Sequence, residues 1–225
     1  TSLYAVGDDW QAIYHFTGAA LNLTTAFHTH FGEGDLCVLD TTYRFNTRIG
    51  EIANAFIQQN PSQLRKTLRS LAPGDKNAVT SLPEAQLSAL LDKMSGYVPP
   101  DATILILGRY HHRRPALLEQ AATRWPNLAI SFMTIHACKG READYVIVCG
   151  MDEGTEGFPA PSRESVMETV LLPAQEPFPD AEERRLLYVA LTRAKQRVWL
   201  LYNPEQPSRF IGELNTLGVP IARKP

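Results

Sequence analysis

Four short polar segments carry the side chains of this sequence that could bind a phosphate or stack on a flat ring. They are residues 7–19, 40–45, 133–142 and 182–195. The first three directly follow apolar runs of the kind that form buried strands. Ligands of α/β proteins bind where such strands end, so these segments are the candidate functional regions of the chain.

The first two segments combine polar and aromatic residues. Gln11 precedes two aromatic residues, Tyr14 and Phe16. Aromatic rings in a loop after a strand can either anchor the loop in the core or stack on bases. In the second segment, Arg44 could reach a phosphate and Tyr43 could stack on a flat ring. A surface salt bridge of Arg44 is the alternative there.

The third and fourth segments carry candidate donors to an anion. In the third, these are Thr134, His136 and Lys139, in a polar turn that follows a strand. A partly buried, hydrogen-bonded histidine is the alternative for His136. In the fourth, Arg193 lies near the expected end of a helix. It could stabilise a transition state, or it could be a C-terminal cation that favours the helix dipole.

The elements that would position these residues alternate between strands and helices. Seven apolar runs are predicted strands: Leu3–Val6, Leu36–Leu39, Ala78–Ser81, Thr103–Leu107, Ile130–Thr134, Tyr145–Cys149 and Val198–Tyr202. Four segments with helical apolar spacing are predicted helices: Asn46–Gln59, Pro83–Met94, Pro115–Trp125 and Glu182–Lys195, the last with Asp180 as its expected N-cap. This alternation predicts an α/β fold with a doubly wound parallel sheet.

The composition is that of an ordinary globular protein, with 44% apolar and 20% charged residues among 225. The sequence contains no run of about 18 uncharged apolar residues, so no membrane span is predicted. Three cysteines without metal-ligand spacing favour a reducing compartment. A net charge of −2 excludes nucleic-acid binding by bulk electrostatics, so any such binding must use local patches and stacking.

Charge is distributed unevenly along the chain. Residues 152–183 contain nine acids and one arginine, a local charge of −8, within a proline-rich stretch. Long loops of this kind are often functional, and a solvated surface insertion is the alternative. Residues 109–114 show the opposite bias, with three arginines and two histidines.

Taken together, the four segments resemble motifs III, IV, V and VI of the superfamily 1 UvrD/Rep-type DNA helicases, in the same order. The resemblance rests on Gly-Asp-x-x-Gln-x-Ile-Tyr from Gly7, Tyr-Arg at 43–44, Thr-x-His-x-x-Lys-Gly-x-Glu from Thr134 and Tyr-Val-Ala-x-Thr-Arg-Ala from Tyr188. Residues 154–159 are also similar to the Gly-x-Phe-Pro segment that follows motif V. The resemblance covers essentially the whole chain and implies a RecA-like, P-loop NTPase-type fold.

The resemblance implies a nucleotide site made of five residues. Gln11 would sense the γ-phosphate, and Tyr43 would stack on the adenine. Arg44 would contact the γ-phosphate, and Glu142 would hydrogen-bond the ribose. Arg193 would be the arginine finger, a group of a class worth about 10³–10⁵ in rate. The implied ligand is ATP with Mg²⁺.

The resemblance also implies a track for single-stranded DNA. Tyr14 and Phe16 would stack on bases, and Thr134 and His136 would contact the strand. Cys138 stands where the family more often has serine. Because a thiol is a weak donor, the sequence does not support a phosphate contact at that position.

Two phosphate-handling motifs of the family are absent from this sequence. It has neither a Gly-x-x-x-x-Gly-Lys-Ser/Thr loop nor an Asp-Glu-x-x-Asp segment. In the family both lie in the first RecA-like domain. Residues 1–35 are therefore expected to be the tail of that domain with a crossing helix, and residues 36–225 the second RecA-like domain. The Mg²⁺ ligands are expected in the missing first domain and none in this chain, which is expected to be inactive alone.

The implied activity is ATP-dependent 3′-to-5′ translocation on single-stranded DNA with unwinding of the duplex. The implied partners are single-stranded DNA, duplex junctions and the N-terminal RecA-like domain of the same protein, in the bacterial cytoplasm and with no membrane. One alternative is a stand-alone RecA-like module that binds DNA or a partner without catalysis. Another is a different α/β enzyme, against which the sequence shows no Gly-x-Ser-x-Gly elbow.

Overall fold

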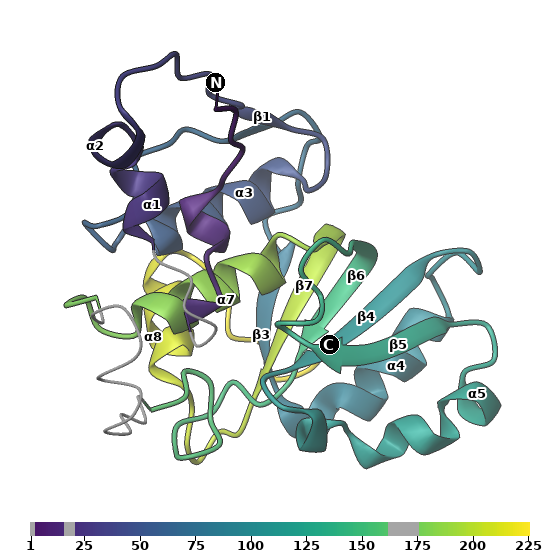
Figure 1. The fold of residues 1–225 in the computed structure, drawn as a ribbon. Coiled ribbons are helices and arrows are strands. Elements are labelled where there is room, and N and C mark those ends of the chain that lie inside the picture. Colours follow the sequence, from purple (N-terminus) through teal and green to yellow (C-terminus); the bar gives the residue numbers. More distant parts are fainter. Residues whose placement is uncertain (1–2, 16–20, 162–175) are drawn as a thin grey trace.

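A five-stranded, all-parallel sheet forms the centre of the computed structural model (Figure 1), which describes residues 3–15, 21–161 and 176–225. The strand order is β3-β7-β6-β4-β5. The strands are β3 (Val79–Pro83), β4 (Thr103–Gly108), β5 (Ala129–Thr134), β6 (Ala143–Val148) and β7 (Ala194–Tyr202). All five had been predicted from their apolar runs, although β7 begins four residues earlier than expected.

Alternating side chains of each central strand enter two separate cores. On β4, Leu105 and Leu107 join one hydrophobic cluster, and Ile104 and Ile106 join the other. This is the period-two alternation of a strand that is covered on both faces. The near-continuous apolar sequence of β4 therefore reflects burial on both sides.

Helices cover both faces of the sheet, which confirms the predicted doubly wound arrangement (Figure 1). One face carries α3 (Thr47–Ile57), α7 (Ala181–Leu191) and α8 (Arg209–Thr216). The other face carries η3 (Glu84–Gln86), α4 (Leu87–Ser95), η5 (Ala116–Gln120) and α5 (Ala121–Arg124). Among the described residues, no helix is both long and apolar enough to cross a membrane.

The remaining elements of the N-terminal part of the chain, apart from α3, are short. They are η1 (Asp9–Gln11), α1 (Asn22–Thr25), α2 (Phe27–Phe31) and the two-residue strands β1 (Thr41–Thr42) and β2 (Arg69–Ser70), which pair in parallel. A further short 3-10 turn, η4 (His111–Arg113), follows β4. Of these elements, η1 contributes Trp10 to the main core, whereas α1 and α2 contribute no buried residue.

Two predicted strands were wrong. Leu3–Val6 and Leu36–Leu39 form no strand, and their side chains are exposed, with Leu39 83% accessible. A strand needs a neighbour to satisfy its backbone groups. Within the described part of the chain, neither run is hydrogen-bonded to another strand.

The last predicted helix is shorter than expected, and its predicted cap was wrong. Helix α7 ends at Leu191, so Lys195 belongs to β7. Asp180 does precede the helix, but it has a left-handed backbone and its side chain makes no capping bond. Its carboxylate instead accepts two hydrogen bonds from Arg209, at 2.7 and 2.8 Å. This long-range ion pair replaces the local cap.

Helix α8 is an element that the sequence analysis missed. It begins after Ser208, whose hydroxyl accepts a hydrogen bond from the backbone N–H of Phe210 at 3.1 Å. Phe210, Ile211 and Leu214 from this helix are buried in the main core. The predicted helix Pro115–Trp125 is also different, because its first half is the 3-10 turn η5.

Candidate functional site

The first and third polar segments are in contact, although more than 110 residues separate them. The hydroxyl of Tyr14 donates to the carbonyl of His136 at 3.1 Å. In the other direction, the ammonium of Lys139 donates to the carbonyl of Gln11 at 2.9 Å and lies 5.1 Å from the centre of the Tyr14 ring. Gly140 has φ +84° in this turn, a conformation that glycine adopts readily. The two segments together form one polar surface.

The N-terminal segment is anchored by a tryptophan that the sequence analysis did not consider. Trp10 is 1% exposed and lies edge-on to Tyr188 of α7, with 5.4 Å between the ring centres. Its indole N–H donates to the carbonyl of Leu64 at 3.0 Å. The neighbouring Asp9 is fully buried and accepts a hydrogen bond from the backbone of Leu64. Trp10 therefore anchors the loop in the core, and Tyr14 remains half-buried at the surface.

The side chain of Arg193 is buried and ends beside Gln11. Its guanidinium donates to the carbonyls of Val189 and Arg141, at 3.0 and 3.3 Å, and to the amide oxygen of Gln11 at 3.5 Å. Within the described ranges, none of its hydrogen bonds goes to a carboxylate. Burial, and then repulsion from Arg44, lower the pKa of Arg193. The structure thus holds a buried cation that forms no ion pair with a carboxylate of the described chain.

An open pocket of about 570 Å³ lies at the start of the second polar segment. It is lined by Thr41, Thr42, Tyr43, Arg44, Glu142 and Lys195. Tyr43 is 83% exposed, so its side chain is accessible to a ligand. Three of the predicted site residues therefore line one pocket, while Gln11 and Arg193 do not line it.

Glu142 lies between two cations in this pocket. Its Oε2 is 3.5 Å from Nε of Arg44, and its Oε1 is 3.0 Å from Nζ of Lys195. The Lys195 hydrogen bond, more than Arg44, lowers the pKa of Glu142. The same contact raises the pKa of Lys195. Both groups are thus held in their charged forms.

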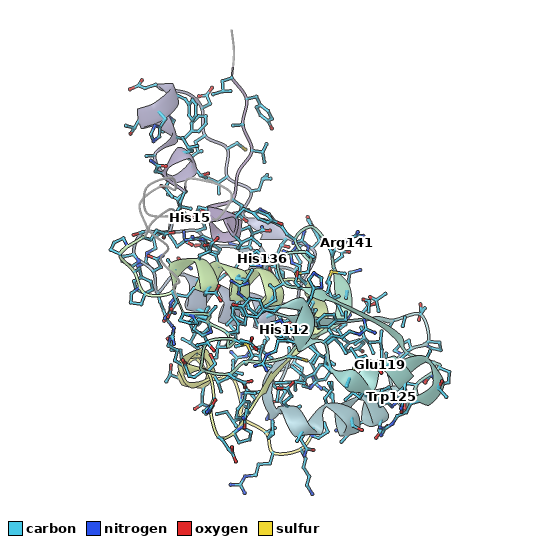
Figure 2. The ribbon with its side chains drawn as sticks, turned by 60° about the horizontal axis from the view of Figure 1, so that its bottom comes forward. His15, His112, Glu119, Trp125, His136 and Arg141 are labelled. Carbon is cyan, nitrogen blue, oxygen red and sulfur yellow. The ribbon has the colours of Figure 1, made fainter. Side chains whose placement is uncertain are left out.

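His136 has an environment that favours the neutral imidazole. Burial, together with the charge of Arg109, lowers its pKa from 6.5 to about 4, against a hydrogen bond to the backbone of Ile13. Its ring centre is 6.1 Å from that of Tyr14. Figure 2 labels His136 in the middle of the molecule, away from Glu119 and Trp125 at the α5 end. Thr134, also predicted here, is buried and accepts a hydrogen bond from the backbone N–H of Ala137 at 3.3 Å.

The structure adds site residues that sequence reasoning missed. Lys195 lines the pocket, and the sequence shows it only as a basic residue two positions after Arg193. Lys139, a predicted donor to an anion, donates to the backbone carbonyl of Gln11 in this structure. The predicted base-stacking residue Phe16 lies outside the described residues.

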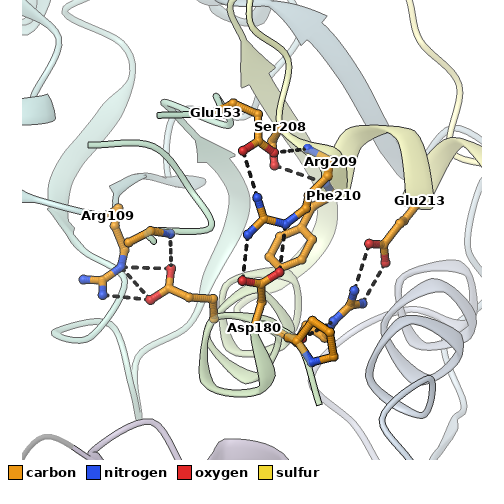
Figure 3. Close-up of polar contacts among 11 residues, drawn as sticks. Arg109, Glu153, Asp180, Ser208, Arg209, Phe210 and Glu213 are labelled. Carbon is orange, nitrogen blue, oxygen red and sulfur yellow. Dashed lines mark hydrogen bonds and ion pairs between the residues drawn. The ribbon is translucent and has the colours of Figure 1, made fainter. Parts of the chain in front are cut away.

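The basic stretch and the acidic stretch predicted from the sequence pair with each other. Arg109 forms a double hydrogen bond with Glu183, and Arg113 binds Asp152 at 3.0 Å. Figure 3 shows Arg109 on its carboxylate partner, and it shows Arg209 between Glu153 and Asp180. These charges are therefore largely neutralised within the fold.

Metal ligands are not clustered in the described part of the chain. No group of three histidine, cysteine or acidic side chains there is arranged to hold a metal ion. Of the three free cysteines, Cys138 and Cys149 are buried, and burial raises the pKa of both thiols, that of Cys138 to about 12. The chemistry of this surface is therefore that of guanidinium, ammonium, amide and aromatic groups.

The sequence is similar to proteins that are named as DNA helicases and to a helicase domain family. Residues 111–205 match the family model of the UvrD-like helicase C-terminal domain. The chain is 68% identical over its entire length to DNA helicase IV of Escherichia coli K12, of which it covers 33%. It is 41% identical over 106 residues to DNA helicase II of the same organism, covering 43% of this chain and 13% of that protein.

A solved structure shares the fold. The C-terminal domain of a possible DNA helicase from Lactobacillus superimposes with a TM-score of 0.50 at 18% identity, covering 80% of this chain and 98% of that one. The chain spans about a third of the length of the DNA helicase IV relative.

Proposed function

Since the chain belongs to the UvrD/Rep-like DNA helicases, we propose that it forms the C-terminal part of an ATP-dependent helicase. In this proposal it supplies one wall of the ATP cleft and part of the track for single-stranded DNA. The parent protein couples ATP hydrolysis to 3′-to-5′ translocation and to unwinding at duplex junctions.

The observation that carries the proposal is the meeting of Gln11 and Arg193, which are 182 positions apart, close to a second arginine. Two nearby guanidiniums repel each other, and the hydrogen bonds of Arg193 go only to neutral oxygens. A triphosphate between them would supply the missing negative charge. Arg193 then acts as the arginine finger, Arg44 binds the γ-phosphate and Gln11 senses it.

The open pocket provides the part of the proposed nucleotide site that binds the adenine and the ribose. The exposed ring of Tyr43 stacks on the adenine, and Glu142 accepts a hydrogen bond from the ribose. The hydrolysed species is ATP with Mg²⁺. We place the metal ligands and the phosphate-binding loop in a first RecA-like domain outside this chain, so that the chain alone is inactive.

The contact between the first and third segments supports a DNA surface. Tyr14 presents a half-buried ring beside a neutral His136, and base stacking on such rings contributes about 1–3 kcal/mol per base. Thr134 ends β5 directly before the turn that carries His136, and base stacking by Phe16, which lies outside the described residues, is part of the same proposal. A neutral imidazole can stack and donate a hydrogen bond without adding charge.

The first RecA-like domain is the partner that this chain is proposed to pack against. The exposed apolar runs Leu3–Val6 and Leu36–Leu39 support that contact, because exposed clusters of large apolar side chains mark interaction surfaces. They have strand-like sequences and lack a partner strand among the described residues. A sheet in the missing domain would satisfy their backbone groups.

The test is Arg193→Ala in the intact protein. We expect DNA-stimulated kcat for ATP to fall about 10³-fold or more, with the Kd for single-stranded DNA nearly unchanged. Arg197→Ala, four residues later on β7 and paired with Asp75, is the control and should leave both values unchanged. An equal loss of ATPase and DNA affinity would assign Arg193 a structural role. DNA binding by a wild-type protein without ATPase would favour a non-catalytic binding module.

A further inference from the structure

The pocket contains one charged residue to which the proposed function gives no role. Lys195 contacts Oε1 of Glu142, while Arg44 contacts Oε2, so each cation holds a different oxygen of one carboxylate. The lysine contact is the shorter of the two, at 3.0 Å against 3.5 Å. Glu142 therefore offsets the charge of one of the two cations and is shared between them.

The position of Lys195 relative to Arg44 is set by one buried side chain, that of Asn46. Its Oδ1 accepts a hydrogen bond from the backbone of Ile49 and caps α3. Its Nδ2 donates to the carbonyls of Lys195 and Gln196, at 3.2 and 2.8 Å. The loop that carries Arg44 and the first turn of α3 are thereby fixed to the beginning of β7. Lys195 lies in the pocket because of this connection.

We propose that Lys195 is a positioning residue of the nucleotide pocket, which holds the Glu142 carboxylate in place while Arg44 exchanges it for the phosphate. This inference rests on the proposed function of the pocket. When Arg44 turns to the triphosphate, Glu142 loses one partner. Lys195 keeps the carboxylate charged and oriented, with Oε2 free to accept a hydrogen bond from a ribose hydroxyl.

The geometry distinguishes this role from direct phosphate binding. A lysine that binds phosphate should leave its carboxylate when the anion arrives, and its removal should weaken any polyphosphate. A lysine that positions Glu142 should matter only for ligands that have a ribose. Its effect should also vanish when Glu142 can no longer form an ion pair.

The experiment measures DNA-stimulated ATPase of the intact protein for Lys195→Met, Lys195→Arg, Glu142→Gln and the double variant K195M/E142Q. An exposed ion pair changes an equilibrium about 1.4- to 5-fold. We therefore expect K195M to raise KM for ATP about three- to five-fold with kcat near wild type. K195R should restore most of the affinity. In the E142Q background, K195M should change KM by less than about 1.5-fold, because the partner of Lys195 is already lost.

Inorganic tripolyphosphate, used as a competitive inhibitor, separates the two roles of Lys195. Its Ki should be the same for wild type and K195M. A Ki that rises as much as KM, or additive effects of the two substitutions, would overturn the positioning role. An unchanged KM in K195M and in Lys195→Gln would overturn it as well. A wild-type protein without ATPase would instead refute the proposed function. Thermal melting checks the fold of each variant, and we expect no change because Lys195 is 41% exposed.

Discussion

Replacing His136 by glutamine should reduce the loss in free energy of unfolding that occurs when the pH falls from 7 to 5. In the folded chain the pKa of His136 is about 4, because burial and the charge of Arg109 disfavour the imidazolium. In the unfolded chain it returns to the ordinary value of 6.5. As the pH falls below 6.5, the unfolded chain takes up a proton that the folded chain does not. The neutral histidine therefore contributes stability that is complete above pH 6.5 and is lost progressively as the pH falls towards 4.

The size of the effect follows from the two pKa values. Between pH 7 and pH 5, proton linkage alone gives a loss of at most about 1.8 kcal/mol for this one group. His136 is partly open to water, which screens the effect, so we expect about 1 kcal/mol. Carboxylates add little to this window, since they titrate mainly below it.

Urea unfolding at pH 7 and pH 5 measures this difference. The wild-type chain should lose about 1 kcal/mol more between the two pH values than His136→Gln loses. The comparison of two pH values removes any fixed cost of the substitution. His111→Gln, at an exposed position, is the control and should behave as wild type. Equal losses in wild type and His136→Gln, or an imidazole of His136 that titrates near 6.5 by NMR in the folded chain, would refute the reasoning.

Two further predictions concern packing and DNA contact. Arg184→Ala should lower the free energy of unfolding by about 2–4 kcal/mol in urea titrations. Arg184 is 6% exposed, and its removal leaves Glu213 without its ion-pair partner and opens space beside Phe56. Arg184→Met should lower the free energy of unfolding by less, and equal losses in the two variants would mean that only the charge contributes. Tyr14→Ala should weaken binding of single-stranded DNA to the intact protein by about 1–3 kcal/mol in fluorescence anisotropy, whereas Tyr14→Phe, which keeps the ring, should bind nearly as wild type. An equal loss of affinity in both variants would mean that DNA binding depends on the Tyr14 hydroxyl and its hydrogen bond to the carbonyl of His136, and not on the ring.

The sheet was largely predictable from the sequence because its strands are buried on both faces. A run such as Ile104 to Leu107 has no polar side, which is typical of a parallel strand that is covered on both faces. Leu3–Val6 has the same local signal but no neighbour among the described residues. Local sequence therefore identifies a segment that can form a strand, whereas pairing depends on what lies beside it.

The candidate site residues were chosen from the sequence by type and motif, whereas their partners could not be predicted from it. Arg44 and Arg193 follow recognisable motifs, yet their contacts depend on side chains that are distant in sequence. Lys195 illustrates the limit, because its place in the pocket depends on hydrogen bonds from Asn46, which is 149 positions away. Asp180 shows the same effect, since pairing with Arg209 outweighs the local preference for a cap.

Arg209 has a consequence for how the length of this protein can vary. Its guanidinium forms ion pairs with the carboxylates of Glu153 and Asp180, with N–O distances of 2.8 and 2.7 Å. These ion pairs hold the two ends of the stretch between Glu153 and Asp180 close to each other. The spacing of those ends then no longer depends on how many residues join them. In polymer terms, doubling the stretch would add only the entropy of closing a longer loop, about 0.6 kcal/mol. The order of the strands in the sheet is thus expected to be independent of the number of residues that join these two acids.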